Sequence, residues 1–297
     1  MIDEIFELAS DDGMTRRGIL SMPERRLPAA VLVLLQAGVK YRVGPSRLYV
    51  DIARSLAESG FATLRFDPIG VGESDGTMES GHLHDLWRTI ECGRFVADTV
   101  LVVESVRERL GEAKVYLGGL CGGGLTLQLA AAALSERPPA GLISINTAVA
   151  YSRGRNQPPA PGHIEARANL SAYSRKVLSA DAWRRVVSGA SDYRSIAATL
   201  SALFSGSTDP SAHGVNPLFL SAFREVHLRG VPHLMIFSEN DSRWFQFQEF
   251  VLGSELGGAR EGPTHSVRLI PQANHDLHWK EWRATACGWI TEWMQRG

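Results

Sequence analysis

The chain has 297 residues, of which 44% are hydrophobic and 21% are charged, and its formal net charge is −1. This composition is ordinary for a globular protein with a sizeable buried core, and it argues against general disorder. Because a net charge so close to zero provides no overall field to attract nucleic acid or anionic lipid, we expect neither as a partner.

The N-terminal residues and the cysteines indicate where in the cell the protein is located and whether it binds a metal. Acidic residues stand where a secretory signal carries Lys or Arg, and no apolar run reaches the ~18 residues that a membrane helix needs. We therefore expect a cytoplasmic protein without a membrane span. Cys92, Cys121 and Cys287 are too scattered for a disulfide framework or a paired zinc site, so free thiols and no metal or cofactor are expected, with Cys92 and Cys287 assigned to packing inside helices.

Apolar runs of strand length alternate with helical patterns along most of the chain, which indicates a mostly parallel sheet flanked by helices. Two short strands open the chain, at 5–9 and 15–21, and Asp11-Asp12-Gly13 between them is typical of a hairpin turn. Further strands are predicted at 29–35, 61–66, 114–120, 141–148, 231–237 and 266–270, and helices at 47–59, 93–110 and 123–134.

A final helix is predicted near the C-terminus. It carries an aromatic stripe on one face: Trp279, Trp282, Ala286, Trp289 and Trp293. Such a stripe is more often core packing than a ligand cage.

Residues 151–216 interrupt the alternation of strands and helices. The stretch is rich in Ser, Ala and Arg and has prolines near both ends. We interpret it as a helical cap, or lid, inserted into a core formed by 1–150 and 217–297. Between 151 and 194 it carries eight Arg or Lys against three Asp or Glu. A solvated helical surface is the simpler interpretation of this excess, and a docking face for an anionic acyl carrier is the alternative.

A glycine-rich turn joins the strand at 114–120 to the following helix, in the sequence Gly119-Leu120-Cys121-Gly122-Gly123-Gly124. A side chain at the tip of so sharp a turn is exposed above the sheet in a strained backbone conformation, and Gly119 and Gly123 flank it where a Cβ would collide with neighbouring chain. The N-terminus of the helix lowers the pKa of a thiol and offers the N–H of Gly122 to a developing oxyanion. No Lys-Ser/Thr follows, which disfavours a phosphate loop.

The pattern G-x-C-x-G resembles the nucleophile elbow of α/β hydrolases, with Cys where Ser is usual. Dienelactone hydrolases and polyhydroxyalkanoate synthases have a Cys at this position. The run at 36–47 is similar to a segment of small α/β hydrolases associated with the exosortase A system, and Asp67 to Ser74 is similar to a structural loop of the fold. The resemblance implies an α/β-hydrolase fold with an eight-stranded, mostly parallel sheet.

In this family an acid and then a histidine follow the nucleophile along the chain, each after a later strand. The resemblance assigns the acid to Asp241, with Glu239 as the nearest competitor, and the histidine to His275, with His278 as the alternative. His275 would accept the proton of Cys121, and Asp241 would orient the imidazole.

The loop after the strand at 29–35 is where relatives supply a second oxyanion N–H. Many of them carry His-Gly there, whereas this chain has Gln36-Ala37, so the donor could be the amide of Gly38 or Val39, and we favour Val39. Arg42 could bind a substrate carboxylate or phosphate, or could brace the loop, which we favour.

These residues predict acyl-transfer chemistry. The leading interpretation is an esterase- or thioesterase-like hydrolase that acts on a small-molecule acyl ester or thioester through an acyl-thioester enzyme. An acyltransferase is the alternative, because a thioester also reacts with amines, alcohols and thiols, and acyl-CoA or an acyl carrier protein is a candidate donor. A non-catalytic binder on the same scaffold comes third. The sequence does not specify the oligomeric state.

Overall fold

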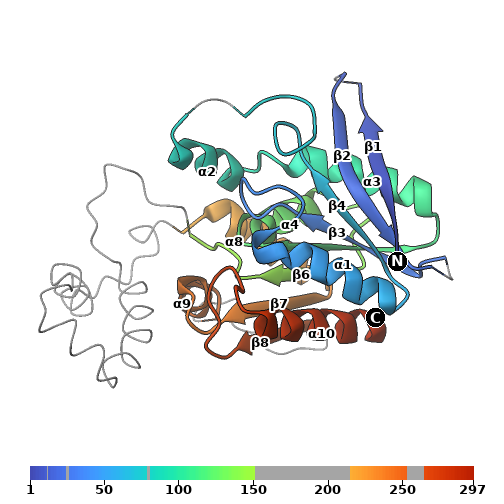
Figure 1. Cartoon of the computed structure of the whole chain (residues 1–297). Helices are drawn as coiled ribbons and strands as arrows, with labels where there is room; N and C mark the ends of the chain where they lie inside the picture. Colours follow the sequence, from blue (N-terminus) through green and yellow to red (C-terminus); the bar gives the residue numbers. More distant parts are fainter. Residues whose placement is uncertain (12, 25–26, 79–80, 151–214, 253–263) are drawn as a thin grey trace, which may run out of the picture.

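The structure is a computed structural model that describes residues 1–11, 13–24, 27–78, 81–150, 215–252 and 264–297 (Figure 1). Eight strands form one sheet in the order β1-β2-β4-β3-β5-β6-β7-β8. The β1–β2 and β2–β4 pairs are antiparallel and the other pairs are parallel. The predicted eight-stranded, mostly parallel sheet is therefore confirmed, and so is the predicted hairpin.

The strands and helices follow the predicted alternation. The strands are β1 (Ile2–Ala9), β2 (Thr15–Met22), β3 (Ala30–Leu35), β4 (Ala62–Asp67), β5 (Lys114–Leu120), β6 (Gly141–Ile145), β7 (His233–Ser238) and β8 (His265–Ile270). The helical elements are η1 (Pro45–Arg47), α1 (Leu48–Glu58), α2 (Leu83–Glu91), α3 (Val96–Leu110), α4 (Gly122–Ala133), α8 (Pro217–Leu228), α9 (Ser242–Phe247), η3 (Gln248–Leu252) and α10 (Lys280–Arg296).

Helices cover both faces of the sheet, so the central strands are buried on both sides (Figure 1). All six residues of β3 are buried, as its continuously apolar sequence predicts. Leu32 and Leu34 pack in the cluster under α1 and α10, whereas Val31 and Val33 pack in the cluster under α3 and α4. A rigid platform of parallel strands results, and the loops at their carboxyl ends can carry functional side chains.

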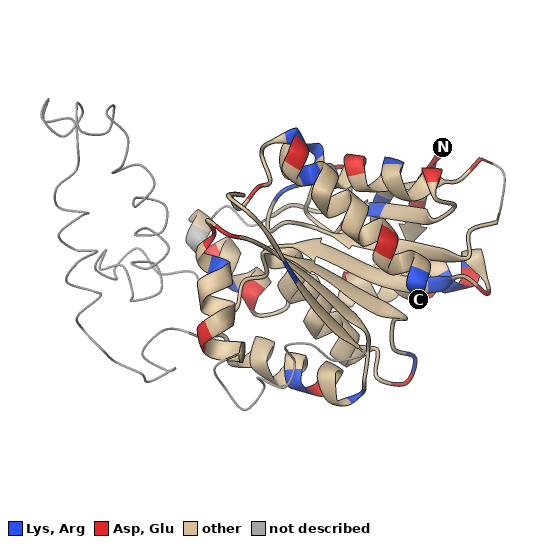
Figure 2. Cartoon of the chain, turned by 90° about the horizontal axis from the view of Figure 1, so that it is seen from below, with Lys and Arg blue, Asp and Glu red and all other residues tan. Residues whose placement is uncertain are grey.

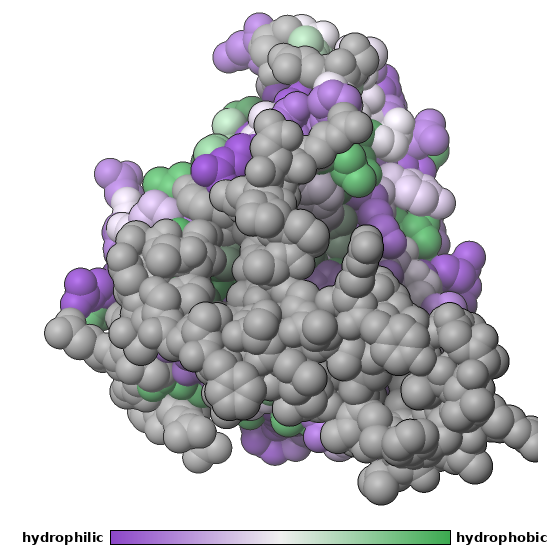
Figure 3. Space-filling model, turned by 90° about the vertical axis from the view of Figure 1, so that its left-hand side faces the viewer, coloured by the Kyte–Doolittle hydropathy of each residue, from purple (hydrophilic) through white to green (hydrophobic). Residues whose placement is uncertain are grey.

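The positions of Lys, Arg, Asp and Glu fall mostly on the helices and near the ends of the strands (Figure 2). Among the described residues visible in Figure 3, hydrophobic surface occurs in small patches separated by hydrophilic ones. Within the described part of the chain, no helix is long and apolar enough to cross a membrane.

The helix predicted at 93–110 is present as α3, which begins three residues later, at Val96. An additional helix that was not predicted, α2, precedes it, and Gly93 lies between the two helices with φ +92°. Ile90, Phe95 and Val71 are buried together beside this break. A residue with positive φ ends a helix, and here the glycine allows α2 to depart from the direction of α3.

Two of the packing assignments need correction. Trp279 precedes α10 and is 62% exposed, whereas Trp282, Trp289 and Trp293 pack against the core as predicted. Cys92 directly follows α2 and is exposed, so it is not a packing residue, whereas Cys287 is buried inside α10. The stripe therefore begins only where the helix does.

The predicted cap falls mostly on residues 151–214, which lie outside the described residues, so the helical cap and the domain division stay predictions. The described residues on either side of that segment meet: Ala150 and Val215 form an isolated antiparallel bridge, and Asn216 N–H donates to Val149 O at 3.0 Å. Strands β6 and β7, which precede and follow the segment, pair directly with each other.

Acid is expected to destabilise the fold through two buried histidines, His233 and His265, which begin the paired strands β7 and β8. His233 lies 2.8 Å from Ser144 Oγ, and His265 lies 3.0 Å from His227 Nδ1. Burial, followed by the charge of neighbouring histidines, lowers the pKa of His233 to about 3 and that of His265 to about 4. Unfolded histidine binds its proton near pH 6.5, so their contribution is fully present above that pH and declines as the pH falls toward 4.

At pH 5 each of the two histidines should cost about 2 kcal/mol of unfolding free energy relative to pH 7.5. Urea denaturation at the two pH values measures this loss. His233→Gln should reduce the difference between the two pH values, whereas His278→Gln, at an exposed site, should leave it unchanged. A difference that is the same in the wild type and His233→Gln would contradict the assignment.

Candidate active site

Cys121 occupies the tip of a strained turn between β5 and α4. Its backbone has φ 55° and ψ −112°, which a non-glycine residue adopts only where the surrounding structure holds it. The Cys121 N–H donates to Ile145 O at 2.9 Å, and α4 begins at the next residue. The helix N-terminus therefore points at the thiol, as the sequence predicts for an elbow.

The glycines around Cys121 are required by close backbone approach. A Cβ on Gly119 would lie 2.5 Å from Gly123 C, and a Cβ on Gly123 would lie 2.4 Å from Leu35 O. A Cβ on Gly124 would lie 2.2 Å from Thr147 Oγ1. No real Cβ tolerates such distances, so the collisions expected from the sequence are present on both sides of the turn.

The structure brings the predicted acid, histidine and cysteine together. Asp241 lies just after β7 and His275 lies in the loop after β8; Asp241 Oδ2 is 2.6 Å from His275 Nδ1. His275 and Cys121 line the same cavity, and each shifts the pKa of the other. Because Nδ1 faces the carboxylate, Nε2 is the nitrogen available to the sulfur.

The two alternative residues lie elsewhere. Glu239 Oε2 accepts a hydrogen bond from the Gln272 N–H at 2.8 Å, and His278 is exposed, with its backbone N–H bonded to Asn274 Oδ1 at 3.1 Å. Neither side chain lines the cavity beside Cys121.

Asn146, at the end of β6, braces the histidine loop. Its Nδ2 donates to His275 O at 2.9 Å and to Ser238 Oγ at 2.8 Å, and its Oδ1 accepts from Ser238 N–H at 2.7 Å. The side chain is buried, and its backbone φ is 45°. Asn146 therefore ties His275 to the end of the strand that precedes Asp241. Sequence analysis missed this residue, since nothing in its neighbourhood marks it.

The environment favours a charged cysteine–histidine pair. Burial by itself would raise the pKa of the Cys121 thiol, but the hydrogen bond and charge of His275, followed by the charge of Arg243, lower it below its ordinary value. Burial opposes a charged His275, yet its hydrogen bonds to Asp241 and Cys121 raise its pKa to about 10. The arrangement therefore stabilises thiolate and imidazolium together.

A cavity of about 520 Å³ opens beside Cys121. Its apolar wall consists of Ala37, Pro45, Leu83, Trp87 and Leu120, and its polar groups come from Lys40, Cys121, Arg243, His275 and Asp276. A mostly apolar pocket with a few convergent polar groups is the usual form of a small-molecule site. Among the described residues, no group of three or more His, Cys, Asp or Glu is placed to hold a metal ion.

The predicted oxyanion donors are only partly brought together. A Cβ on Gly122 would lie 3.1 Å from Gly38 N, so these two backbone segments are adjacent. The Gly38 N–H donates within its own turn to Gln36 O at 2.9 Å. Val39, the favoured donor, packs its side chain against the cluster of Val71, Ile90 and Phe95 and does not line the cavity.

Trp87, from α2, covers this glycine turn. A Cβ on Gly38 would lie 2.2 Å from the Trp87 ring, and one on Gly122 would lie 3.3 Å from it. The ring therefore closes one side of the cavity above the elbow. The sequence carries no signal for this contact, because Trp87 lies within a segment for which no element was predicted.

Arg42 pairs with another residue of the protein and does not line the cavity. Its backbone N–H donates to Asp67 Oδ1 at 2.7 Å, and its guanidinium pairs with the same buried carboxylate. Asp67 Oδ2 also accepts from the Glu73 N–H at 3.2 Å, and Ser74 Oγ donates to Asp67 O at 2.5 Å. These contacts favour the bracing role for Arg42 over the substrate contact.

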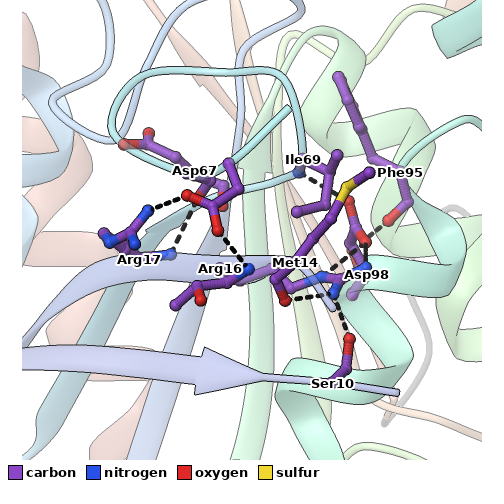
Figure 4. Close-up of polar contacts among 12 residues, drawn as sticks. Ser10, Met14, Arg16, Arg17, Asp67, Ile69, Phe95 and Asp98 are labelled. Carbon is purple, nitrogen blue, oxygen red and sulfur yellow. Dashed lines mark hydrogen bonds and ion pairs between the residues drawn. The ribbon is translucent and has the colours of Figure 1, made fainter. Parts of the chain in front are cut away.

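A second buried ion pair secures the same loop (Figure 4). Arg16 donates to Asp98 Oδ1 at 2.8 Å, and the other Asp98 oxygen accepts from the Ile69 N–H at 2.9 Å. The loop that begins at Asp67 is thus held by β2 and α3 as well as by Arg42, which agrees with its expected structural role.

Tyr49, on α1, ties the elbow strand to the neighbouring strand. Its buried hydroxyl donates to Leu35 O at 2.6 Å and accepts from Leu120 N–H at 2.9 Å. Because Leu120 directly precedes Cys121 and Leu35 ends β3, one side chain sets the spacing of the two loops that flank the cavity.

Tyr49→Phe is therefore expected to lower the unfolding free energy by about 1–3 kcal/mol, since both backbone groups lose a buried partner. Urea denaturation followed by tryptophan fluorescence measures the loss. Tyr116→Phe is the matched control, because the Tyr116 hydroxyl makes no hydrogen bond with any described residue. Equal losses in the two variants would show that the Tyr49 hydroxyl contributes nothing specific.

The amino-acid sequence is similar to those of known proteins. A family model described as serine aminopeptidase, S33, matches residues 33–213. A polyketide transferase from Penicillium, grgF, is 30% identical over 144 residues. That alignment covers 46% of this chain and 42% of the relative, so the chain spans about two fifths of the length of the curated relative it matches.

Several solved structures share the fold. Est1E from Butyrivibrio proteoclasticus, with ferulic acid bound, matches with a TM-score of 0.59 and 16% identity over 98% of both chains. Dienelactone hydrolase from Anabaena variabilis matches with a TM-score of 0.57 and 14% identity over 99% of this chain and 98% of that one. An esterase from Pyrococcus furiosus matches with a TM-score of 0.60 and 11% identity over 99% and 91%. These similarities show an α/β-hydrolase fold.

Proposed function

This chain belongs to the serine aminopeptidase S33 family of α/β hydrolases, and on that premise we propose that it is an acyl hydrolase with Cys121 as its nucleophile. The observation that supports this most is that Asp241 Oδ2 lies 2.6 Å from His275 Nδ1 and that His275 lines one cavity with Cys121 at the strained turn. The family name refers to serine, whereas this chain has cysteine at the turn, so the nucleophile is the part of the proposal that most needs a test.

In the proposed reaction the Cys121 thiolate attacks the acyl carbon of an ester or thioester, and the carbonyl oxygen becomes an oxyanion. The Gly122 N–H at the start of α4 stabilises that charge, with the amide of Gly38 or Val39 as the second donor. When the tetrahedral intermediate collapses, the bond to the leaving group breaks, and the imidazolium of His275 protonates the leaving alcohol or thiol through Nε2.

The second half of the reaction releases the acyl group from Cys121. His275, now neutral, takes a proton from water as the water oxygen attacks the thioester carbon. Collapse of this second intermediate breaks the C–S bond, yields the carboxylic acid and restores the thiolate–imidazolium pair. Asp241 keeps the proton on Nδ1 throughout, so that Nε2 faces the sulfur.

Acyl transfer to another acceptor is the second candidate function. Partial identity with a polyketide transferase favours it, and a thioester intermediate reacts readily with amines, alcohols and thiols. The same residues would operate, with the acceptor taking the place of water. Acyl-CoA and an acyl carrier protein are donors to include in the test.

The test uses the purified chain with 4-nitrophenyl esters and with short and medium acyl-CoAs, and compares wild type with Cys121→Ala. Intact mass spectrometry follows the acyl adduct, and absorbance or free thiol follows product release. Cys287→Ala is the matched control, because that cysteine is buried in α10, away from the cavity.

A Cys121-dependent adduct that decays in water would support the hydrolase. An adduct that persists until an amine, alcohol or thiol is added would support the transferase. Adduct formation that survives Cys121→Ala, or none on any donor, would overturn the cysteine mechanism.

A further inference from the structure

Arg243 places a positive charge in the cavity beside Cys121. It lies in the first turn of α9, two residues after Asp241, and its side chain lines the same cavity as Cys121 and His275. Its charge is close enough to lower the pKa of the Cys121 thiol. None of the roles proposed above for Cys121, His275 and Asp241 requires this guanidinium.

The guanidinium of Arg243 is poorly paired. Its Nη1 donates to Gln246 Oε1 at 3.3 Å, while its Nε is buried and has no hydrogen-bond partner. Among the described residues, no carboxylate forms an ion pair with it. A buried donor on a cation without a partner costs free energy, and an acceptor bound beside it would lower that cost.

The other cation of the cavity differs in this respect. Lys40 Nζ lies 3.9 Å from Asp276 Oδ2, and the two side chains are 53% and 45% exposed. Its charge is offset by a neighbour and screened by water. Of the two cations that line the cavity, Arg243 is therefore the one without a carboxylate partner among the described residues.

We propose that Arg243 binds a carboxylate carried by the acyl part of the substrate, which makes this chain selective for acyl groups with an anionic end. The inference rests on the proposed acyl hydrolase function. A guanidinium presents a planar fork of donors that matches a carboxylate, and the pair strengthens where water is excluded. The apolar wall that includes Leu83 and Trp87 would hold the methylene chain between the carboxylate and the reacting carbonyl.

A simpler role for Arg243 is to stabilise the Cys121 thiolate. That role would act on every substrate equally, because the thiolate attacks each of them. Carboxylate binding acts only on substrates that carry the charge. Selectivity between matched substrates therefore separates the two roles.

The experiment compares 4-nitrophenyl monoesters of adipic and suberic acid with the same esters methylated at the free carboxyl group. We measure kcat/KM for wild type, Arg243→Gln and Arg243→Lys at constant ionic strength. Wild type should prefer the free acid. Arg243→Gln should lower kcat/KM for the acid about 30-fold more than for the methyl ester, mainly through KM, and Arg243→Lys should recover part of this selectivity.

Lys40→Gln is the control for charge in the same cavity, and it should change the ratio of acid to methyl ester less than about threefold. A ratio that is the same in wild type and Arg243→Gln would overturn the carboxylate site while leaving the hydrolase intact. Loss of turnover of both esters in Cys121→Ala tests the underlying function separately.

A further arm compares acetyl-CoA with acetyl-N-acetylcysteamine, which lacks the phosphates. A loss in Arg243→Gln that is confined to acetyl-CoA would place the anion on the leaving group and overturn the inference for the acyl group.

Discussion

Replacement of His275 by alanine is expected to lower kcat/KM for an acyl ester by about 10³- to 10⁴-fold, because both the base for the thiol and the acid for the leaving group are lost. Asp241→Asn should cause a loss of similar order. The Asn amide can donate to Nδ1 and so stabilise the tautomer that has its proton on Nε2. In that tautomer Nε2 can no longer accept a proton. Steady-state kinetics with a 4-nitrophenyl ester measures both variants.

His278→Ala is the control for the histidine, since that residue lies three positions further along the same segment, is exposed and does not line the cavity. Its kcat/KM should stay within about twofold of wild type. The rate of Cys121 alkylation by iodoacetamide at pH 6.5 provides a second readout, because loss of the imidazolium should reduce the thiolate fraction. If His275→Ala kept full activity, or if His278→Ala matched its loss, the assigned base would be wrong.

Replacement of Gly123 by alanine is expected to cost about 3 kcal/mol or more of unfolding free energy. The new methyl carbon would lie 2.4 Å from Leu35 O and 2.8 Å from Gln36 O, and both contacts are with backbone rather than with a flexible side chain. Strand β3 and helix α4 would have to move apart beneath the cavity. Urea denaturation followed by circular dichroism measures the loss.

Gly288→Ala is the matched control within α10. No heavy atom lies within 4 Å of its Cβ position, and alanine favours a helix over glycine by up to about 1 kcal/mol, so this variant should be as stable as wild type or more stable. A Gly123→Ala protein with wild-type stability would show that the turn can open without cost. If Gly123→Ala proved insoluble, protease resistance of the two variants in cell extract would provide the comparison.

The sheet and the nucleophile turn could be predicted from the sequence because their signals are local. A continuously apolar strand such as β3 predicts burial on both faces. Glycines on both sides of Cys121 predict a turn in which backbone segments approach each other closely. The positions of Asp241 and His275 at the ends of later strands follow from the order of the fold. Parallel strands bring their carboxyl ends to one edge, so residues far apart in the chain can meet there.

Other features depend on contacts that no local pattern encodes. Arg243 follows Asp241 by two residues, and that spacing was the one available hint of its place in the cavity. Trp87, Tyr49 and Asn146 reach the site from α2, α1 and the end of β6, through contacts with glycine or backbone atoms. Sequence analysis also missed α2, which ends two residues before Gly93 and packs Ile90 against Val71 and Phe95.

The sequence by itself determined the order of the strands and the strained turn at Cys121, because side-chain period and glycine act within short segments. The candidate acid and histidine came from the resemblance of the chain order to that of a known family. Only the tertiary structure decided that Asp241 Oδ2 and His275 Nδ1 lie 2.6 Å apart, that Arg42 pairs with Asp67, and that Arg243 stands in the cavity without a carboxylate partner among the described residues. Hydrogen bonds and ion pairs depend on distances of a few tenths of an ångström between segments distant in sequence, and packing sets those distances.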